Sequence, residues 1–219
     1  MKNLKKLSIL AASALLAVAF LAAGCGSDSA SSGSSSKNTT VTVGATPVPH
    51  GEILNEIKPL LAKEGVDLKV VEFTDYVKPN LALNDKELDA NFFQHSPYLD
   101  KFNSEHGTKL KAIAKIHVEP MGIYSHKIKD LKDLPDGAKV AIPNDPTNGG
   151  RALLILQSAG LIGLKDGGNI TSTVQDVEKN DKHLQFVELE AAQIPRSIDD
   201  VDIALINTNF AMEAGLNPL

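Results

Sequence analysis

The sequence has a single cysteine, no tryptophan and no surplus of positive charge. With Cys25 alone, disulfide bonds within the chain and metal sites built from several thiolates are excluded. A formal net charge of −5 argues against nucleic-acid binding and against electrostatic adhesion to a membrane. The GxSxG motif of serine hydrolases and the GxxxxGK(S/T) nucleotide loop are also missing. These absences predict a protein that is not an enzyme.

The six histidines do not recur at the spacing of a metal site. Neither HxxxH nor HExxH occurs, and no cysteine could complete a zinc ligand set. The sequence therefore predicts no metal site and no cofactor. The residues concerned are His50, His95, His106, His117, His126 and His183.

Residues 1–24 have the three parts of a secretory signal peptide. Basic residues open the chain, an apolar run covers residues 7–23, and the sequence LAAGC ends it. This ending is similar to a lipobox, so we expect cleavage before Cys25 and attachment of lipid, palmitate included, to its thiol. A permanent membrane-spanning helix is the alternative, because the apolar run is at the short limit of what spans a bilayer.

Residues 25–40 are mostly Ser, Gly, Ala, Asp and Asn. Such a segment buries too little apolar surface to offset the entropy of ordering the chain. We therefore expect a flexible tether. It would leave the folded part lipid-anchored to the cell membrane on the extracytoplasmic face.

From residue 41 onward, strand and helix patterns alternate. Apolar runs at 41–45 and 67–73 flank a segment whose apolar residues recur at helical spacing, which predicts a parallel pair with a right-handed crossover. Pro59 lies inside that helix and predicts a kink or an interruption. The whole pattern predicts an α/β fold with a mainly parallel sheet. Other strands are expected at 89–93, 122–125, 139–142, 184–189 and 202–206, and helices at 96–105 and 151–159.

Polar and aromatic residues gather in the loops after these strands, where open parallel sheets bind ligands. Gly149 and Gly150 at a helix start would let backbone N–H groups approach an anion, and the fork of Arg151 fits a carboxylate. A surface arginine beside a flexible turn is the alternative. Tyr76 and Phe92, at strand ends, are candidates for a wall of the cleft.

Four longer strings resemble the NlpA/MetQ lipoprotein family, the substrate-binding lipoproteins of methionine ABC importers. They are FTDYVKPN (73–80), DANFFQH (89–95), HVEPMGIYS (117–125) and IPND (142–145). The resemblance extends from about Val41 to the end of the chain.

The resemblance implies a two-lobed fold similar to that of type II periplasmic binding proteins, with two crossing strands. Lobe 1 would comprise residues 41–117 and lobe 2 residues 118–206, and residues 207–219 would begin a return to lobe 1. The crossings are expected near 117–120 and 206–210. Members of the family usually continue for several tens of residues further, so the resemblance also implies a truncated end and an incomplete lobe 1.

The resemblance further implies that methionine binds between the lobes and passes to the permease and ATPase of an importer. The side-chain pocket would be lined by Tyr76, Phe92 and His95. The polar clamp would consist of Arg151 on the carboxylate, Asn148, and either Asn207 or Asn209. Other functions stay open: a receptor for a related amino acid or a methionine-containing dipeptide, and a surface lipoprotein for adhesion or sensing.

Overall fold

The computed structural model describes residues 39–218. The predicted signal peptide, the lipid attachment site Cys25 and nearly all of the predicted tether lie outside the described residues. Strand β1 (Thr39–Ala45) begins two residues earlier than predicted, within the range assigned to the tether. Its first two residues belong to the strand because they pair with the start of β2 (Val66–Glu72).

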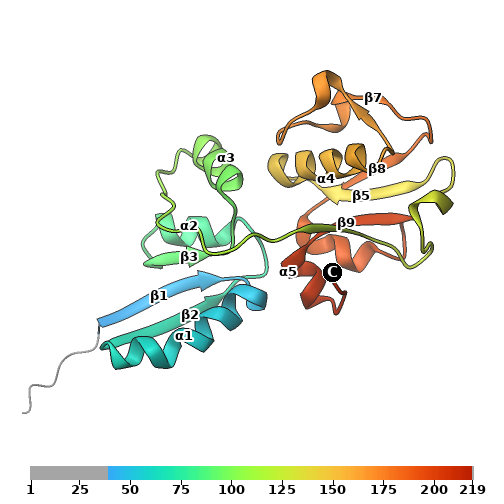
Figure 1. Cartoon of the computed structure of the whole chain (residues 1–219). Helices are drawn as coiled ribbons and strands as arrows, with labels where there is room; N and C mark the ends of the chain where they lie inside the picture. The colour runs from blue at the N-terminus through green and yellow to red at the C-terminus, as the bar shows by residue number, and fades with distance from the viewer. Residues whose placement is uncertain (1–38, 219) are drawn as a thin grey trace, which may run out of the picture. The chain divides into compact units, whose positions relative to one another are not determined.

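β1 is the central strand of the first sheet, whose order is β2-β1-β3 (Figure 1). Both β2 and β3 (Ala90–Phe92) run parallel to it. Helix α1 (Glu52–Lys63) lies between β1 and β2 in the chain and packs Leu54 against the core of this sheet. The strand–helix–strand order and the parallel pairing agree with the prediction.

Pro59 does not interrupt α1, so the predicted interruption is wrong. A proline inside a helix removes one hydrogen bond, the one to the carbonyl four residues earlier. That carbonyl belongs to Asn55. Because Asn55 and Pro59 are both exposed, water can bind the freed oxygen and the helix continues.

Two more helices follow in this half of the chain. α2 (Lys78–Asn84) has no counterpart among the predicted elements. α3 (Ser96–His106) begins after His95, whose Nδ1 accepts a hydrogen bond from the backbone N–H of Tyr98 at 3.1 Å. It ends at Gly107, whose φ of 67° lies in the left-handed region that glycine adopts without strain.

The segment after Gly107 leads from the first sheet to the second and has no helix or strand up to residue 120. It contains the predicted first crossing, which is therefore an irregular segment. A strand needs a partner for its backbone hydrogen bonds, and none pairs with this segment within residues 39–218. Ile113 and Val118 are 90% and 92% exposed, so the segment is solvated.

The second sheet has the strand order β4-β9-β5-β8. β5 (Lys139–Pro143) pairs in parallel with β8 (Gln185–Leu189) and with β9 (Ile203–Asn207). β4 (Met121–Tyr124) pairs antiparallel with β9. Four of the six strand pairings of the described residues are thus parallel, which confirms the predicted α/β class with mainly parallel sheets.

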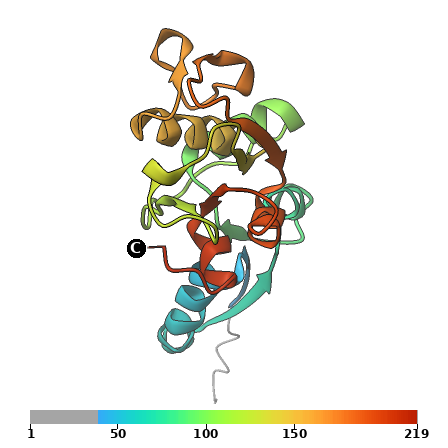
Figure 2. The ribbon, with the colours of Figure 1, turned by 90° about the vertical axis from the view of Figure 1, so that its right-hand side faces the viewer.

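Successive residues of the second sheet pack into different cores on its two faces. Val140 packs with helix α4 (Pro146–Ser158), whereas Ala141 packs with the turn Ala191–Ser197 and with α5 (Thr208–Glu213). This alternation follows from the two-residue period of a strand. Figures 1 and 2 show the helices on both sides of this sheet.

The predicted second crossing, residues 206–210, comprises the end of β9 and the start of α5. α5 contacts the turn Pro47–Gly51, which follows β1, so the chain returns here to the neighbourhood of the first sheet. Strands β6 (Gly163–Leu164) and β7 (Val177–Lys179) form a separate antiparallel pair.

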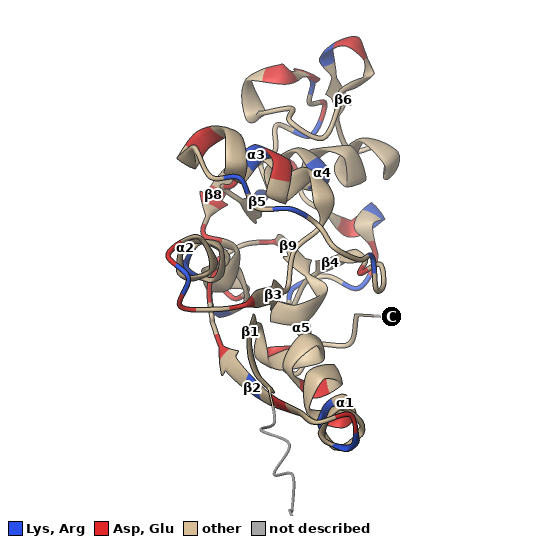
Figure 3. Cartoon of the chain, turned by 90° about the vertical axis from the view of Figure 1, so that its left-hand side faces the viewer, with Lys and Arg blue, Asp and Glu red and all other residues tan. Residues whose placement is uncertain are grey.

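Acidic and basic residues are interspersed over the elements seen in Figure 3. This arrangement agrees with the mixed composition of the sequence, 22 Lys and Arg against 27 Asp and Glu. Among residues 39–218, no helix combines the length and the apolar character that crossing a bilayer requires.

Candidate ligand-binding site

A cavity of about 660 Å³ is bordered by residues from both sheets and from the segment that links them. Its volume falls within the range of pockets that hold small molecules, roughly 300–1,000 Å³. All the predicted site residues lie in its wall, as does the alternative Asn209. They are Tyr76, Phe92, His95, Asn148, Arg151 and Asn207.

The polar part of the wall is a directed chain of hydrogen bonds that starts at Asp145. The carboxylate of Asp145 accepts from Nδ2 of Asn148 at 2.9 and 3.1 Å. Because a carboxylate only accepts, this contact fixes the amide of Asn148 with its oxygen pointing the other way. Oδ1 of Asn148 in turn accepts from Nδ2 of Asn207 at 2.9 Å.

This series of hydrogen bonds leaves one hydrogen-bond acceptor, in the side chain of Asn207, without a donor. Asn207 lies at the end of β9 with 7% of its surface exposed, and its Oδ1 is buried without a hydrogen-bond partner. A buried acceptor left unpaired costs about 1–3 kcal/mol. Since Asn207 lines the cavity, a ligand that carries an N–H donor would remove this cost.

Arg151 projects from α4, and its Nη2 donates a hydrogen bond to the backbone carbonyl of Glu119. Burial lowers the pKa of Arg151 from its ordinary value, while the nearby Tyr76 and Glu119 act in the opposite direction. A half-buried guanidinium has lost part of its hydration, so an anionic ligand group in the cavity would gain a strong partner.

The two glycines before Arg151 do not form the predicted anion cradle. α4 begins at Pro146 instead of 151, with Asp145 as its N-cap, so the glycines lie inside the helix. The N–H of Gly149 donates to the carbonyl of Asp145 at 2.8 Å and is therefore already used. At Gly150 a Cβ atom would lie 2.2 Å from the carbonyl oxygen of Ile170. Gly150 thus permits close packing of the loop that carries Ile170.

Aromatic rings form another part of the wall. Tyr76 lies between the rings of Phe93 and Phe210, with centroid distances of 5.8 and 4.9 Å. Its hydroxyl donates to Oδ1 of Asn209 at 2.6 Å. Burial, followed by the charges of Glu119 and other acids, holds the pKa of Tyr76 well above its ordinary value, so this hydroxyl keeps its proton and remains a donor.

His95 joins the two halves of the site. Its Nδ1 accepts from the backbone of Tyr98, so the ring proton is on Nε2, which lies 3.2 Å from Oδ1 of Asn148 and donates to it. Burial lowers the pKa of His95, the hydrogen bond to Asn148 opposes this, and the charge of Arg151 lowers it further. His95 is therefore neutral at pH 7.

Asn209 is less available for a ligand than Asn207. Besides accepting from Tyr76, it donates from Nδ2 to Glu213 at 3.5 Å, and only 2% of its surface is exposed. The structure thus favours Asn207, whose oxygen is unpaired, as the polar residue facing a ligand.

The cavity wall also contains His50, His117 and Glu119, which were not among the predicted site residues. One carboxylate oxygen of Glu119 lies 3.0 Å from Nε2 of His50 and 2.6 Å from Nε2 of His117. The ring of Phe92 meets that of His50 edge to face at 4.6 Å. Two features of the sequence could have pointed to these residues. His50 follows the first strand, and His117 and Glu119 lie in the string HVEPMGIYS. The spacing rules for metal motifs miss the group because His50 lies far from the other two residues in the chain.

A two-lobed α/β fold with a cavity bordered by both sheets places the chain in the class of periplasmic-binding-protein-like folds. The chain belongs to the NlpA lipoprotein family, whose model matches residues 41–219. This agrees with the resemblance that the four sequence strings carry.

Individual relatives show how far the similarity reaches. The D-methionine-binding lipoprotein MetQ of Escherichia coli K12 is 53% identical over 167 residues, which are 74% of this chain and 62% of that protein. The chain thus spans about three fifths of the length of this relative. A lipoprotein of Ruminococcus gnavus has 48% identity and a TM-score of 0.80, over 82% of this chain and 74% of that one. A nutrient binding protein of Burkholderia cenocepacia, whose structure holds methionine, has 48% identity and a TM-score of 0.77, over 81% and 76%.

Proposed function

We propose that this chain is the extracytoplasmic receptor of an ABC importer and that it binds free methionine. The names of its relatives support the ligand, because one is a D-methionine-binding lipoprotein and another holds methionine in its structure. The receptor would hand its ligand to the permease and ATPase complex of the importer. It would do so without catalysing a reaction.

The unpaired oxygen of Asn207 is the observation that carries this proposal. A free amino acid has an ammonium group with three donors and a carboxylate that only accepts. Asn207 Oδ1 supplies a buried acceptor, and Arg151 supplies a fork of donors in the wall of the same cavity. The two ends of a zwitterion would therefore each find a partner.

The thioether side chain would lie against the aromatic wall. We assign this role to Tyr76 and Phe92, with His95 beside them. A contact between sulfur and an aromatic ring contributes about 0.3–1.5 kcal/mol, so the rings alone bind methionine weakly. The charged clamp and the burial of the ligand by closure of the lobes would supply most of the affinity.

We assign the first lobe to residues 41–117, the second to residues 118–206 and the return towards the first lobe to residues 207–219. The contact of α5 with the turn Pro47–Gly51 supports the last of these assignments. A lipid on Cys25 would fix the protein to the outer face of the cell membrane.

A thermal melt of the purified chain with and without ligand tests the proposed function. At about a hundredfold excess over its Kd, a ligand adds roughly 2.7 kcal/mol to the free energy of unfolding. For a chain of this length, this corresponds to a rise of about 5–10 °C in Tm. We expect this rise with L- or D-methionine and none with leucine.

Each other result has a distinct meaning. A shift of Tm with a methionine-containing dipeptide alone would replace methionine by the peptide as ligand. A cooperative melt that no amino acid or dipeptide shifts would overturn the receptor proposal and favour a role in adhesion or sensing.

A further inference from the structure

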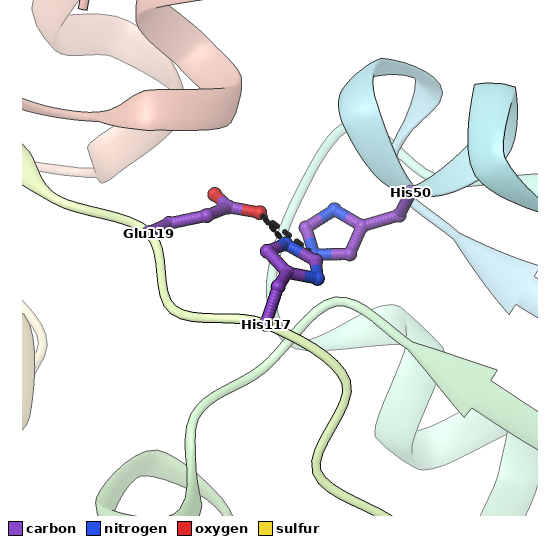
Figure 4. A group of neighbouring side chains, drawn as sticks. All are labelled: His50, His117 and Glu119. Atoms are coloured by element: carbon purple, nitrogen blue, oxygen red, sulfur yellow. Dashed lines mark hydrogen bonds and ion pairs between the residues drawn. The ribbon is translucent and has the colours of Figure 1, made fainter.

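We propose that His50, His117 and Glu119 form a binding site for a divalent transition-metal ion such as Zn²⁺. The three side chains come from two separate parts of the chain and point towards one another (Figure 4). Their ligand atoms all lie within 4.8 Å of one another. Among the described residues, this is the one group of at least three His, Cys, Asp or Glu side chains with that geometry. The three residues border the same cavity as the proposed methionine site, but the proposal rests on their own geometry and not on the identity of the ligand.

The donor set suits a transition metal of intermediate softness. Two imidazole nitrogens and one carboxylate oxygen are ligands that Zn²⁺ and its neighbours bind at about 2.0–2.2 Å. Ligand atoms around a tetrahedral ion lie roughly 3.4 Å apart at such bond lengths. The two contacts to Glu119, at 3.0 and 2.6 Å, are already shorter, so an ion would require only small rotations of the three side chains.

The surroundings of the carboxylate also favour a cation. The side chain of Glu119 is only 19% exposed and lies between the imidazoles of His50 and His117. A carboxylate that has lost part of its hydration needs a partner, and a metal ion is one of the partners that buried charges take in proteins.

A residue outside the ligand set holds His50 in place. Nδ1 of His50 lies 2.6 Å from the hydroxyl of Thr46, and both side chains are buried. When an ion binds Nε2 of His50, the hydroxyl can accept the proton of Nδ1, which leaves the lone pair of Nε2 for the ion. Such partners orient the imidazole and raise its basicity in metal sites.

The surroundings leave room for access and for further ligands. The side chain of His117 is 28% exposed, which provides a path from solvent, and all three residues border the cavity. Zinc sites with three protein ligands keep a fourth position for water or a bound molecule. The cavity would supply that position.

Titration of the purified full chain with Co²⁺ tests the proposal by absorption spectroscopy, and calorimetry with Zn²⁺ gives the stoichiometry. No methionine is present, so a failure here leaves the proposed receptor function untouched. We expect one equivalent of either ion to bind and the Co²⁺ complex to show the visible bands of a four-coordinate site. Absence of saturable binding would overturn the proposal.

Substitutions assign the ligands. His117→Ala and Glu119→Gln should each weaken Zn²⁺ binding at least a hundredfold, and Thr46→Val by about 10–100-fold. His117 is the most exposed of the ligands, so His117→Ala tests the site even if other variants unfold. Unchanged Zn²⁺ affinity in a folded His117→Ala protein would contradict the proposal.

Two exposed histidines provide matched controls. His126 lies 2.7 Å from Asp199, and His183 lies 2.8 Å from Asp136. Each is a histidine–carboxylate pair outside the three-ligand group. His126→Ala and His183→Ala should leave the Zn²⁺ affinity unchanged. An equal loss in these controls would show nonspecific binding to histidine and overturn the assignment.

Discussion

The chain has two arginines, and they occupy very different surroundings. Arg151 lies half-buried in the cavity wall, whereas Arg196 is exposed in the turn Ala191–Ser197 and does not border the cavity. If methionine binds through its carboxylate, removal of Arg151 costs a charge-assisted contact of about 1.5–3 kcal/mol. This exceeds the contribution of any one sulfur–aromatic contact.

We therefore expect Arg151→Ala to weaken methionine binding by roughly 10–150-fold, more than Phe92→Ala does. Isothermal titration calorimetry measures the methionine affinity of both variants. Arg196→Ala is the control, because it removes an arginine that does not border the cavity. Near-native methionine affinity of the Arg151→Ala protein would refute the proposed contact between Arg151 and the ligand carboxylate.

Neutral His95 gives a second prediction at this scale, on the pH dependence of stability. Because the folded state lowers the pKa of His95, the unfolded chain binds a proton there more readily, with an ordinary pKa of about 6.5. As the pH falls below that value, the unfolded state gains the proton first. The free energy of unfolding therefore decreases until the folded-state pKa is reached.

His95→Asn should reduce this decrease. Asparagine does not titrate and retains an acceptor at the N-cap of α3. Urea unfolding at several pH values between 7 and 5 measures the slope in the two proteins. Parallel slopes for the wild type and His95→Asn would contradict this account of His95.

At the scale of elements, the packing of α4 against the loop that carries Ile170 gives a prediction with a definite sign. In an open helix interior, Gly→Ala stabilises by about 1 kcal/mol. At Gly150, however, the added methyl would lie 2.2 Å from the carbonyl oxygen of Ile170. We expect Gly150→Ala to destabilise the protein by about 1–3 kcal/mol.

Gly51→Ala is the comparison, because the nearest atom to its Cβ, the carbonyl oxygen of Thr46, would lie 3.2 Å away. Its cost should be smaller than that of Gly150→Ala. Denaturant unfolding measures both changes. A Gly150→Ala protein more stable than the wild type would show that the loop can move away from α4.

Sequence patterns predicted those elements that bury a regular apolar face. The β-branched run of β1 and the periodic residues of α1 indicated a parallel unit, which the pairing of β1 with β2 confirms. α2 escaped prediction because it is short and has no apolar periodicity. The predicted start of α4 is too late because two glycines weaken the helical pattern there, although Asp145-Pro146 is itself a typical helix start.

The site residues that could be predicted from the sequence pattern are those located at or after the ends of predicted strands. Tyr76, Phe92 and Arg151 lie at or after strand ends, and all three border the cavity. The proximity of His50 to Glu119 was not predictable, because it depends on the path of an irregular segment with no periodic pattern. Likewise, which asparagine oxygen stays unpaired depends on the hydrogen-bond chain that begins at Asp145.

For the molecule as a whole, charge bears on the mode of membrane attachment. Removal of residues 1–24 would remove Lys2, Lys5 and Lys6 and no acidic residue, which makes a chain of net charge −5 still more negative. Such a chain is repelled by anionic lipid headgroups, so attachment would depend on the acyl groups of Cys25.

We expect Cys25→Ser to move the protein from the membrane fraction to the soluble fraction. High salt should fail to release the wild type, whereas detergent should release it. Immunoblots of fractionated cells measure the distribution, and mass spectrometry of the N-terminal peptide reports the lipid. Release of the wild type by salt alone would show that charge holds it.

The central place of β1 in its sheet has a mechanical consequence. β1 is the first strand of the described residues, and it has seven register pairs with β2 on one side and three with β3 on the other. A pull transmitted along the chain from a moving bilayer would therefore load a strand that is held at both edges. In parallel pairing such a load shears many hydrogen bonds together instead of opening them one at a time. Attachment through the central strand would thus make the lobe resistant to force where the tether meets it.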